Sequence, residues 1–320
     1  MPVRAERRGV SRRVEACVKL PPPLITRLRP LAPRFRVAQI LIYGAVTSAI
    51  YAMLAVGFTL IFGVARILNL AHGSFYALGA YTAYVLTTVL HWPLIPSVVV
   101  SVLIVAAFGV GLERLLVRPL RGSHIAVLMI TLAMSLIVEQ VLFLTFGSEY
   151  RNVPSLASGK VTLIGVDISA QRLVTLGVSV AALALLWLFI QRTRLGSAIL
   201  AVSQDPEAAQ YMGIPSDRVF ATVMGLSAGL AALAAVLAAP FLTVQPGMGL
   251  LPMVKAFAIV IVGGLGSIPG SILGALLLGY SETIVAYLVS TSWTELVSLV
   301  AVLLTLILRP AGLFGKRAAF

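Results

Sequence analysis

A chain of 320 residues in which 59% are hydrophobic and 11% are charged carries more apolar surface than one soluble core can bury. The mean hydropathy of +1.02 places it in a lipid bilayer and excludes a soluble domain. The net charge of +13 does not indicate nucleic-acid binding, because the basic residues gather at the N-terminus and in short loops between apolar runs.

The first 36 residues are basic and polar. Residues 1–36 hold ten of the 24 Lys and Arg, against Glu6 and Glu15, and contain "PPP" at 21–23. With no apolar face, this segment is predicted to be a disordered tail, and it lacks the apolar core and cleavage site of a signal peptide. A basic arm before a first membrane helix is typical of the cytoplasmic side and of contact with anionic membrane lipid.

Apolar runs recur along residues 37–317, most of them roughly 18–25 residues long, the length at which a helix crosses the hydrocarbon core. The alternating pattern of a transmembrane barrel is absent. The sequence therefore predicts an all-α polytopic membrane protein with about 8–10 transmembrane helices. The expected spans are Val37–Gly63, Gly73–Leu90, Ser97–Leu116, His124–Phe146, Arg172–Ile190, Val219–Phe241, Lys255–Gly266, Ile268–Val289 and Trp293–Leu308.

Basic residues in three loops set the orientation. They predict three cytoplasmic regions: Arg114, Arg118 and Arg121; Arg192, Arg194 and Arg218; Arg309, Lys316 and Arg317. Three apparent spans separate the basic tail from the first of these regions, which leaves three alternatives. One span within 37–116 is re-entrant or miscounted, or the N-terminus lies outside with Arg66 inside and "HWPLIP" (91–96) outside, or the mature chain begins near Val37.

Two stretches interrupt the helical pattern inside the apolar region. They are "ARILNLAHGSFYALGAYTAY" (65–84) and "VGGLGSIPGSILGALLLGY" (262–280). Non-helical backbone at membrane depth occurs only where protein or a water-filled cavity surrounds it, so both breaks are candidate parts of a translocation path. The candidate residues are Asn69, His72, Gly73, Gly263, Gly264, Gly266, Pro269 and Gly270. The alternatives are a hydrogen-bonded structural histidine, an Asn69 N-cap and glycines that only allow close helix packing.

Three ionisable residues, Glu139, Lys255 and Glu282, lie in or near the spans and indicate either a pathway or paired, structural positions. No carboxylate or histidine cluster has metal-ligand spacing, and the sequence has no catalytic nucleophile motif or phosphate-binding loop. The sequence therefore predicts no catalytic residue, no metal and no cofactor. ATP, if the protein uses it, is bound by another chain.

A polar island, "QRTRLGSAILAVSQDPEAAQYMGIPSDRV" (191–219), separates two strongly apolar stretches. Its apolar rhythm breaks at Asp205-Pro206, which predicts two short helices. Asp205 suits the N-cap of the second helix, Pro206 its first turn and Gly213 its end. The island is expected to be a cytoplasmic docking element rather than a linker.

Three stretches, "GFTLIFGVARILNLAHGSFYALGAY", "TRLGSAILAVSQDPEAAQYMGI" and "VKAFAIVIVGGLGSIPGSILGALLLG", in this order and spacing, resemble the H-type permease subunit of branched-chain amino acid ABC importers. The resemblance covers about residues 37–317, and the basic tail is not part of the family pattern. It implies a non-enzymatic subunit of the bacterial inner membrane that carries Leu, Ile, Val or related small amino acids and amides.

The resemblance also implies partners: a second, homologous permease subunit, two cytoplasmic ATPases that bind the ATP, and a periplasmic or lipid-anchored substrate-binding protein. In such importers a cytoplasmic "EAA…G" loop enters a groove of the ATPase. Residues 191–218 correspond to this coupling loop. The matching residues are Asp205, Pro206, Glu207, Ala208, Ala209 and Gly213, although the Ile-x-Leu-Pro that follows in the general signature is missing. The alternative, an ion-coupled secondary transporter, would use intramembrane carboxylates and gives the island no role.

Overall fold

The structure is a computed structural model that describes residues 33–157, 159–163, 166–309 and 312–314. Most of the predicted basic tail lies outside these residues. Its last four residues, 33–36, begin the first described helix, α2 (Pro33–Ala65). The prediction of an all-α membrane protein is confirmed, because eight of the described helices are long and apolar enough to cross a bilayer.

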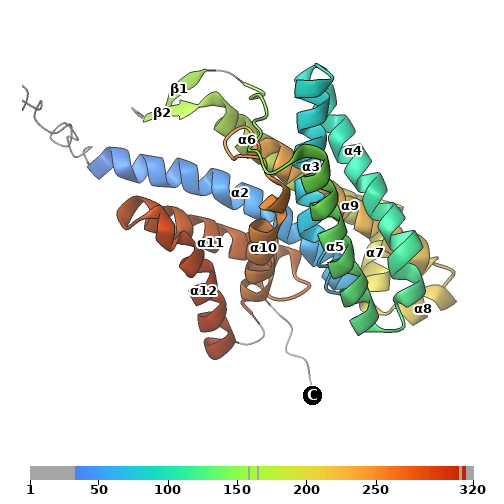
Figure 1. Cartoon of the computed structure of the whole chain (residues 1–320). Coiled ribbons are helices and arrows are strands. Elements are labelled where there is room, and N and C mark those ends of the chain that lie inside the picture. Colours follow the sequence, from blue (N-terminus) through green and yellow to red (C-terminus); the bar gives the residue numbers. More distant parts are fainter. Residues whose placement is uncertain (1–32, 158, 164–165, 310–311, 315–320) are drawn as a thin grey trace, which may run out of the picture.

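Helices make up nearly all of the described chain (Figure 1). A two-stranded antiparallel hairpin of β1 (Lys160–Leu163) and β2 (Val166–Ser169) precedes α6 and pairs Lys160 with Ser169. After α2, the helices are α3 (His72–Tyr84), its π-helical continuation η2 (Val85–Val89), α4 (Leu94–Leu112), η3 (Glu113–Val117), η4 (Arg118–Leu120), α5 (His124–Phe146), α6 (Ala170–Arg192), α7 (Arg194–Gln204), α8 (Pro206–Tyr211), α9 (Ser216–Ala238), η5 (Pro246–Gly249), α10 (Leu250–Gly263), α11 (Ile268–Leu288), η6 (Thr291–Trp293) and α12 (Thr294–Leu308).

Two of the predicted spans differ from the observed helices. The span expected at Lys255–Gly266 runs over Pro246–Gly263 instead, because η5 leads directly into α10. The span expected at Gly73–Leu90 consists of a 13-residue α3 and its π-helical continuation, so it is a shorter and less regular helix than its neighbours.

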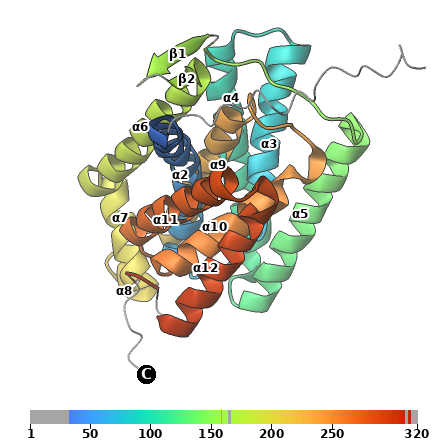
Figure 2. The same cartoon turned by 90° about the vertical axis from the view of Figure 1, so that its left-hand side faces the viewer.

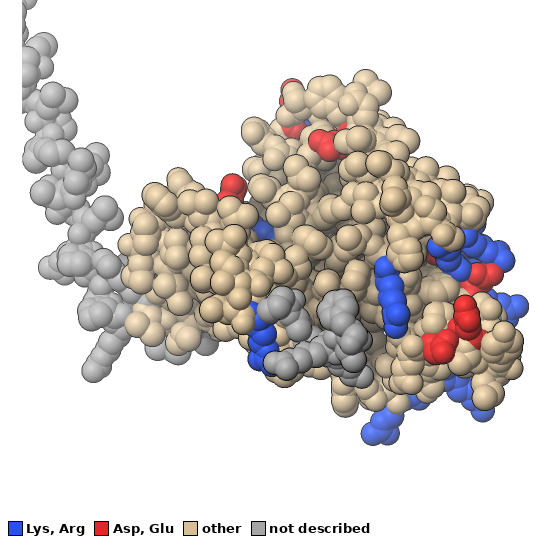
Figure 3. All heavy atoms as spheres, turned by 90° about the horizontal axis from the view of Figure 1, so that it is seen from below, with Lys and Arg blue, Asp and Glu red and all other residues tan. Residues whose placement is uncertain are grey.

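Charged side chains gather on one face of the helix bundle. The hairpin lies at the top of Figure 1, whereas the turn after α4 and the short helix α8 lie at the bottom. Figure 3, which views the molecule from below, shows Lys, Arg, Asp and Glu side chains gathered on one part of this lower face. Basic residues mark the cytoplasmic side, so the hairpin lies on the outer side.

Helix α2 begins on the outer side, since Ala38 near its start packs with Ile168 of the hairpin. Three membrane helices, namely α2, α3 with η2, and α4, then separate this start from the basic turn at 118–123. An odd number of helices puts the two ends on opposite sides. Among the alternatives from the sequence, this arrangement matches the one with Arg66 inside and residues 91–96 outside.

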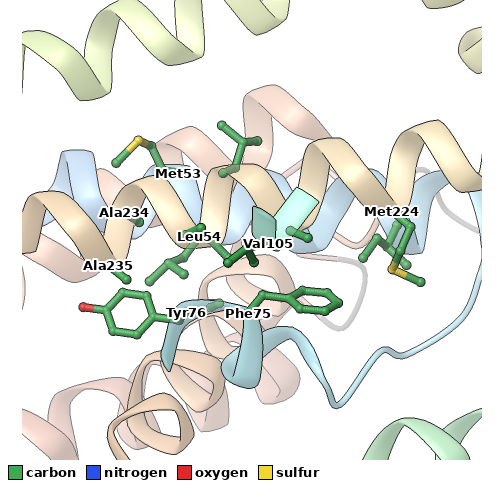
Figure 4. Packing of buried hydrophobic residues seen from close by; sticks show 14 of the residues in the cluster. Met53, Leu54, Phe75, Tyr76, Val105, Met224, Ala234 and Ala235 are labelled. Carbon is green, nitrogen blue, oxygen red and sulfur yellow. The ribbon is translucent and has the colours of Figure 1, made fainter. Parts of the chain in front are cut away.

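The core forms around α2, which passes through the middle of the bundle (Figure 2). In the apolar stretches of α2 and α9 that could cross the membrane, 78% of the residues are buried, against 22% in α5 and 6% in α12. In the close view of Figure 4, Met53 and Leu54 of α2 lie over Phe75 and Tyr76 of α3, with Ala234 and Ala235 of α9 beside them. Peripheral helices α5 and α12 thus present apolar side chains outward, as a lipid or partner surface requires.

Small residues set how closely the central helices approach. A Cβ built on Gly79 of α3 would lie 2.5 Å from the Cα of Ala232 in α9, and one on Gly109 of α4 would lie 2.6 Å from the Cβ of Ala228. Close approach of this kind is the usual basis of helix association in lipid, where no hydrophobic effect drives helices together. The Ala- and Gly-rich sequence of α9 therefore places it against both α3 and α4.

Candidate functional site

The first predicted break is present between α2 and α3. Helix α2 ends at Ala65, Arg66 has a positive φ of 53°, and α3 begins at His72. The His72 ring nitrogen Nε2 lies 3.1 Å from the carbonyl oxygen of Leu54. Because Leu54 precedes the end of α2 by eleven residues, or roughly 16 Å of helix, α3 begins inside the apolar layer.

His72 is completely buried and occupied on every side. Its Nδ1 lies 3.3 Å from the hydroxyl of Ser227 in α9, so its two nitrogens connect α3 to both α2 and α9. Phe58 and Phe75 pack edge-on against the ring, with centroid distances of 5.7 and 6.3 Å. This geometry is that of the hydrogen-bonded structural histidine.

Asn69 shapes the segment that leads into α3. Its Oδ1 accepts a hydrogen bond from the Ala71 N–H at 3.0 Å, and its Nδ2 lies 3.3 Å from the sulfur of Met224. The prediction that Asn69 is the N-cap is wrong, because Ala71 occupies that position without a side-chain cap. A short polar side chain that bonds the N–H two residues on instead stabilises the turn before the helix.

Gly73 brings the start of α3 against the start of α10. A Cβ on Gly73 would lie 2.5 Å from the carbonyl oxygen of Gly249, and one on Gly249 would collide with the Gly73 carbonyl. Helices α3 and α10 therefore begin at the same point, where their backbones cross with no side chain between them. The sequence analysis missed Gly249, although "QPGMG" at 245–249 carries the proline and glycine signal of a helix boundary.

The second predicted break is a tight turn between α10 and α11. Gly264 and Gly266 have φ values of 105° and 82°, which side chains disfavour, and Ser267 caps α11 by accepting from the Gly270 N–H at 3.2 Å. Pro269 occupies the first turn of α11, where its missing N–H costs no helical hydrogen bond. This turn adjoins the inner end of α2, since Gly266 packs on Gly63.

Gly263 and Gly270 touch through their backbones, so that a Cβ on either residue would collide with the carbonyl of the other. The later chain adds to this contact, because Leu313 and Phe314 donate backbone hydrogen bonds of 2.9 and 3.0 Å to Val262 and Gly263. The structure thus divides the predicted path residues between two places. Asn69, His72 and Gly73 lie at the mid-layer crossing, and the second group forms a turn at the inner end.

We expect Gly270→Leu to destabilise the folded protein, because its side chain must push apart two backbones that touch. Overpacking of this kind costs about 1–3 kcal/mol or more. Gly177→Leu is the matched control, since no described atom lies within 4 Å of a Cβ built there. Thermal unfolding in detergent checks the difference; equal midpoints for the two variants would contradict the close contact.

Two of the three ionisable residues in the spans are paired with each other. The Lys255 Nζ lies 2.8 Å from Glu282 Oε2, and the same oxygen accepts from the Tyr51 hydroxyl at 2.6 Å. The Ser298 hydroxyl donates to Glu282 Oε1 at 2.6 Å. One buried carboxylate therefore joins α2, α10, α11 and α12, and its charge is compensated in place.

Glu282→Gln is expected to lower stability by about 3–5 kcal/mol, because it leaves the Lys255 ammonium buried without its counter-charge. The double variant Lys255→Met with Glu282→Gln removes both charges and should be distinctly more stable than the single variant. Thermal unfolding in detergent measures both. If the double variant were as unstable as the single one, charge compensation would not be the role of this pair.

Glu139, the third ionisable residue, lies apart from that network. It is exposed on α5 beside a hollow of about 650 Å³ between α5 and η5. A Cβ on Gly247 would lie 3.1 Å from Glu139 Oε1, so the glycine leaves room for the carboxylate. Neither His72 nor the glycines of the second break line this hollow.

The polar island forms the two predicted helices, α7 and α8. Asp205 caps α8 through hydrogen bonds from the Glu207 and Ala208 N–H groups, at 2.9 and 3.0 Å. Gly213 follows the helix with φ of 81°, and the Gly213 and Ile214 N–H groups bond back to Gln210 and Ala209. This is a Schellman C-terminus, so the three local predictions for Asp205, Pro206 and Gly213 are confirmed.

The two short helices are held firmly on the bundle. Ile199 and Val202 of α7 and Ala209 of α8 are buried in the main core, and the Ser216 hydroxyl donates to the Pro206 carbonyl at 3.3 Å. In contrast, Tyr211 and Met212 at the end of α8 are 89% and 84% exposed. Glu207 and Ala208 are also exposed.

An ion-pair cluster that the sequence analysis missed connects this region to the turn after α4. Arg121 pairs with both Asp217, at 2.6 Å, and the buried Glu113, while Arg118 pairs with Asp217 at 2.6 Å. The Arg121 guanidinium also lies 4.1 Å above the ring of Phe220. Asp217 lies in the first turn of α9, near the end of the polar island, and an acidic residue there also suits the helix dipole.

Membrane helices that begin inside the apolar layer are typical of polytopic membrane transport proteins, and this chain adds a capped two-helix element on the basic face. The family model "Branched-chain amino acid transport system / permease component" matches residues 40–307. The chain belongs to this family, as the resemblance to an H-type permease predicts. It is a multi-pass protein of the bacterial inner membrane.

Curated relatives match over most of their length. The high-affinity branched-chain amino acid transport system permease protein BraD of Pseudomonas aeruginosa is 33% identical, covering 87% of this chain and 95% of BraD. The LivH permease protein of Escherichia coli K12 is 31% identical, with 85% and 94% covered. The probable LivH permease of Methanocaldococcus jannaschii is 29% identical, with 87% and 92% covered.

Proposed function

We propose that this chain is one of two permease subunits of an ABC importer that carries branched-chain amino acids, or related small amino acids and amides, across the inner membrane. The observation that carries the proposal is the family match over residues 40–307, which includes both helix breaks and the polar island. A substrate-binding protein on the outer side delivers the substrate, and a second, homologous permease completes the membrane pore.

The polar island is the part of the chain that fits a cytoplasmic ATPase. Tyr211 and Met212 expose apolar surface at the tip of α8, next to the acidic Glu207, on the face that carries the basic residues. Large apolar side chains held in the open by a rigid, capped helix support a protein docking role. ATP is bound and hydrolysed by that partner, and this chain acts as a transport subunit rather than an enzyme.

Motion of α8 has a direct route into the membrane domain. Ser216 joins α8 to the start of α9, and Asp217 joins α9 to Arg118 and Arg121 in the turn before α5. Helix α9 in turn holds His72 at the start of α3 through Ser227. A shift of the docked ATPases would therefore move α9 and, with it, the break between α2 and α3. This motion would bias the permease between inward- and outward-facing arrangements.

The alternative, an ion-coupled secondary transporter, draws little support from the intramembrane charges. Glu282 is fully engaged by Lys255, Tyr51 and Ser298, which makes it a structural group rather than an ion relay. The relatives are permease components of branched-chain amino acid transport systems, which favours the ABC importer.

Gly213→Pro and Glu207→Arg test the docking role. Proline cannot adopt the positive φ of Gly213 and removes the N–H that bonds to Gln210, so the end of α8 must change shape. The Glu207→Arg variant reverses a charge in the first turn, which costs the helix only about 0.3–1 kcal/mol. We expect both variants to insert and pair with the second permease but to lose ATPase retention or coupled leucine uptake in proteoliposomes.

The matched controls are Gly213→Asn, because asparagine tolerates positive φ, and Glu295→Arg, because Glu295 is an exposed charge at the outer start of α12. Both should keep normal subunit stoichiometry and uptake. Coupled transport at the wild-type rate in Gly213→Pro and Glu207→Arg would show that the island is not the docking element.

A further inference from the structure

The hollow between α5 and η5 has a mixed lining that no part of the proposed coupling mechanism uses. One group of lining residues is apolar and the other can form hydrogen bonds or carry charge. The apolar residues include Leu136, Ile137, Phe143 and Pro246, and the polar ones are Glu139, Gln140, Ser148 and Gln245. With about 650 Å³, the hollow is large enough for a small solute and its water.

Glu139 and Gln140 are exposed at a depth where lipid is a poor environment for them. Glu139 precedes the end of α5 by seven residues, or about 10 Å of helix. A carboxylate in hydrocarbon is costly, and a glutamate lacks the long stem with which Lys and Arg reach the interface. This side of α5 must therefore face water, a ligand or another protein rather than lipid.

The contrast with Glu282 shows what Glu139 lacks. Glu282 is compensated by Lys255 within the chain, whereas in the described part of the chain no ion pair is formed by Glu139. Gly247 stands directly beside the Glu139 carboxylate, and any side chain there would crowd it. The local backbone thus keeps an uncompensated negative charge accessible.

The hollow lies close to the mid-layer crossing of α3 and α10. Ser135, one turn before Glu139 on the same face of α5, accepts a hydrogen bond of 3.0 Å from the Ser74 hydroxyl at the start of α3. Gly249, two residues after Gly247, packs on Gly73. The carboxylate therefore lies on the outer side of the crossing at which α3 and α10 both begin.

We propose that this hollow is a substrate subsite on the translocation path, in which the Glu139 carboxylate receives the α-ammonium group of the transported amino acid. Gln140, Gln245 and Ser148 supply donors for the substrate carboxylate, and Leu136, Ile137 and Phe143 accept an aliphatic side chain. A zwitterion with an apolar side chain matches the three kinds of lining group. The inference rests on the proposed import of amino acids and deepens it.

The test compares Glu139→Gln with Glu295→Gln in the complete importer, reconstituted in proteoliposomes with its binding protein. Uptake of radiolabelled leucine and ATP hydrolysis are measured on the same preparation. Glu139→Gln should lower uptake about tenfold or more, since it removes a charge-assisted contact, while assembly and ATP hydrolysis stimulated by the binding protein persist. Glu139→Asp should recover part of the uptake, and Glu295→Gln should match the wild type.

Gly247→Ala is a second variant that changes no charge. Its methyl group crowds the Glu139 carboxylate, so uptake should fall to an intermediate level with normal assembly. This result is expected only if the space beside the carboxylate is used during transport.

Leucine uptake at the wild-type rate by the Glu139→Gln variant would overturn the inference. Loss of the second permease from the purified Glu139→Gln complex would also overturn it, because Glu139 would then be a subunit contact. Failure of the assembled wild-type importer to take up any aliphatic amino acid would overturn the proposed function and the inference together. Normal wild-type uptake with an unaffected Glu139→Gln variant overturns the inference alone.

Discussion

A backbone that stops being helical inside a bilayer must have its polar groups satisfied by protein, and hydrogen bonds around His72 satisfy several of these groups. Between Ala65 and His72 the chain is not helical. The side chains of Asn69 and Thr131 accept hydrogen bonds from backbone N–H groups of this segment, and the His72 ring bonds to the backbone of α2. Because His72 reaches both Leu54 and Ser227, the break is fixed to α2 and α9 at once. The start of α3, the approach of Gly249 and the hollow beyond it all depend on this junction.

Small residues also allow close contacts between helices in the rest of the bundle. Gly73 admits the backbone of Gly249, Gly79 admits α9, and the Gly263–Gly270 contact holds α10 against α11. In lipid such contacts gain energy from packing alone, so a single added side chain is enough to separate two helices. The two glycine-rich breaks therefore have different roles. One lies next to the hollow, and the other closes the inner end of the bundle.

Local signals in the sequence predicted the local structure well. Asp205, Pro206 and Gly213 determine the ends of α8 within ten residues of chain, and hydropathy placed most of the membrane helices because each is an unbroken apolar run. The start of the span that contains η5 and α10 was predicted nine residues late, at Lys255, although Pro246 and Gly247 begin it. The N-cap of α3 was misplaced because Asn69 bonds Ala71 rather than the first turn of the helix.

Contacts between distant segments were beyond the reach of sequence patterns. Lys255 and Glu282 were each recognised as unusual, yet nothing in a single sequence states that they pair, or that Arg121 and Asp217, 96 residues apart, form an ion pair. The same limit applied to Glu139, which, like Glu282, was recognised only as an ionisable residue within a predicted span. Only the packing separates them, because one carboxylate is enclosed by an ammonium and two hydroxyls and the other opens onto a hollow. In a membrane, a compensated charge can stay buried as a structural group, whereas an uncompensated carboxylate is costly until a cation pairs with it. Among Glu139, Glu282 and His72, that difference makes Glu139 the residue best placed to act on a passing solute.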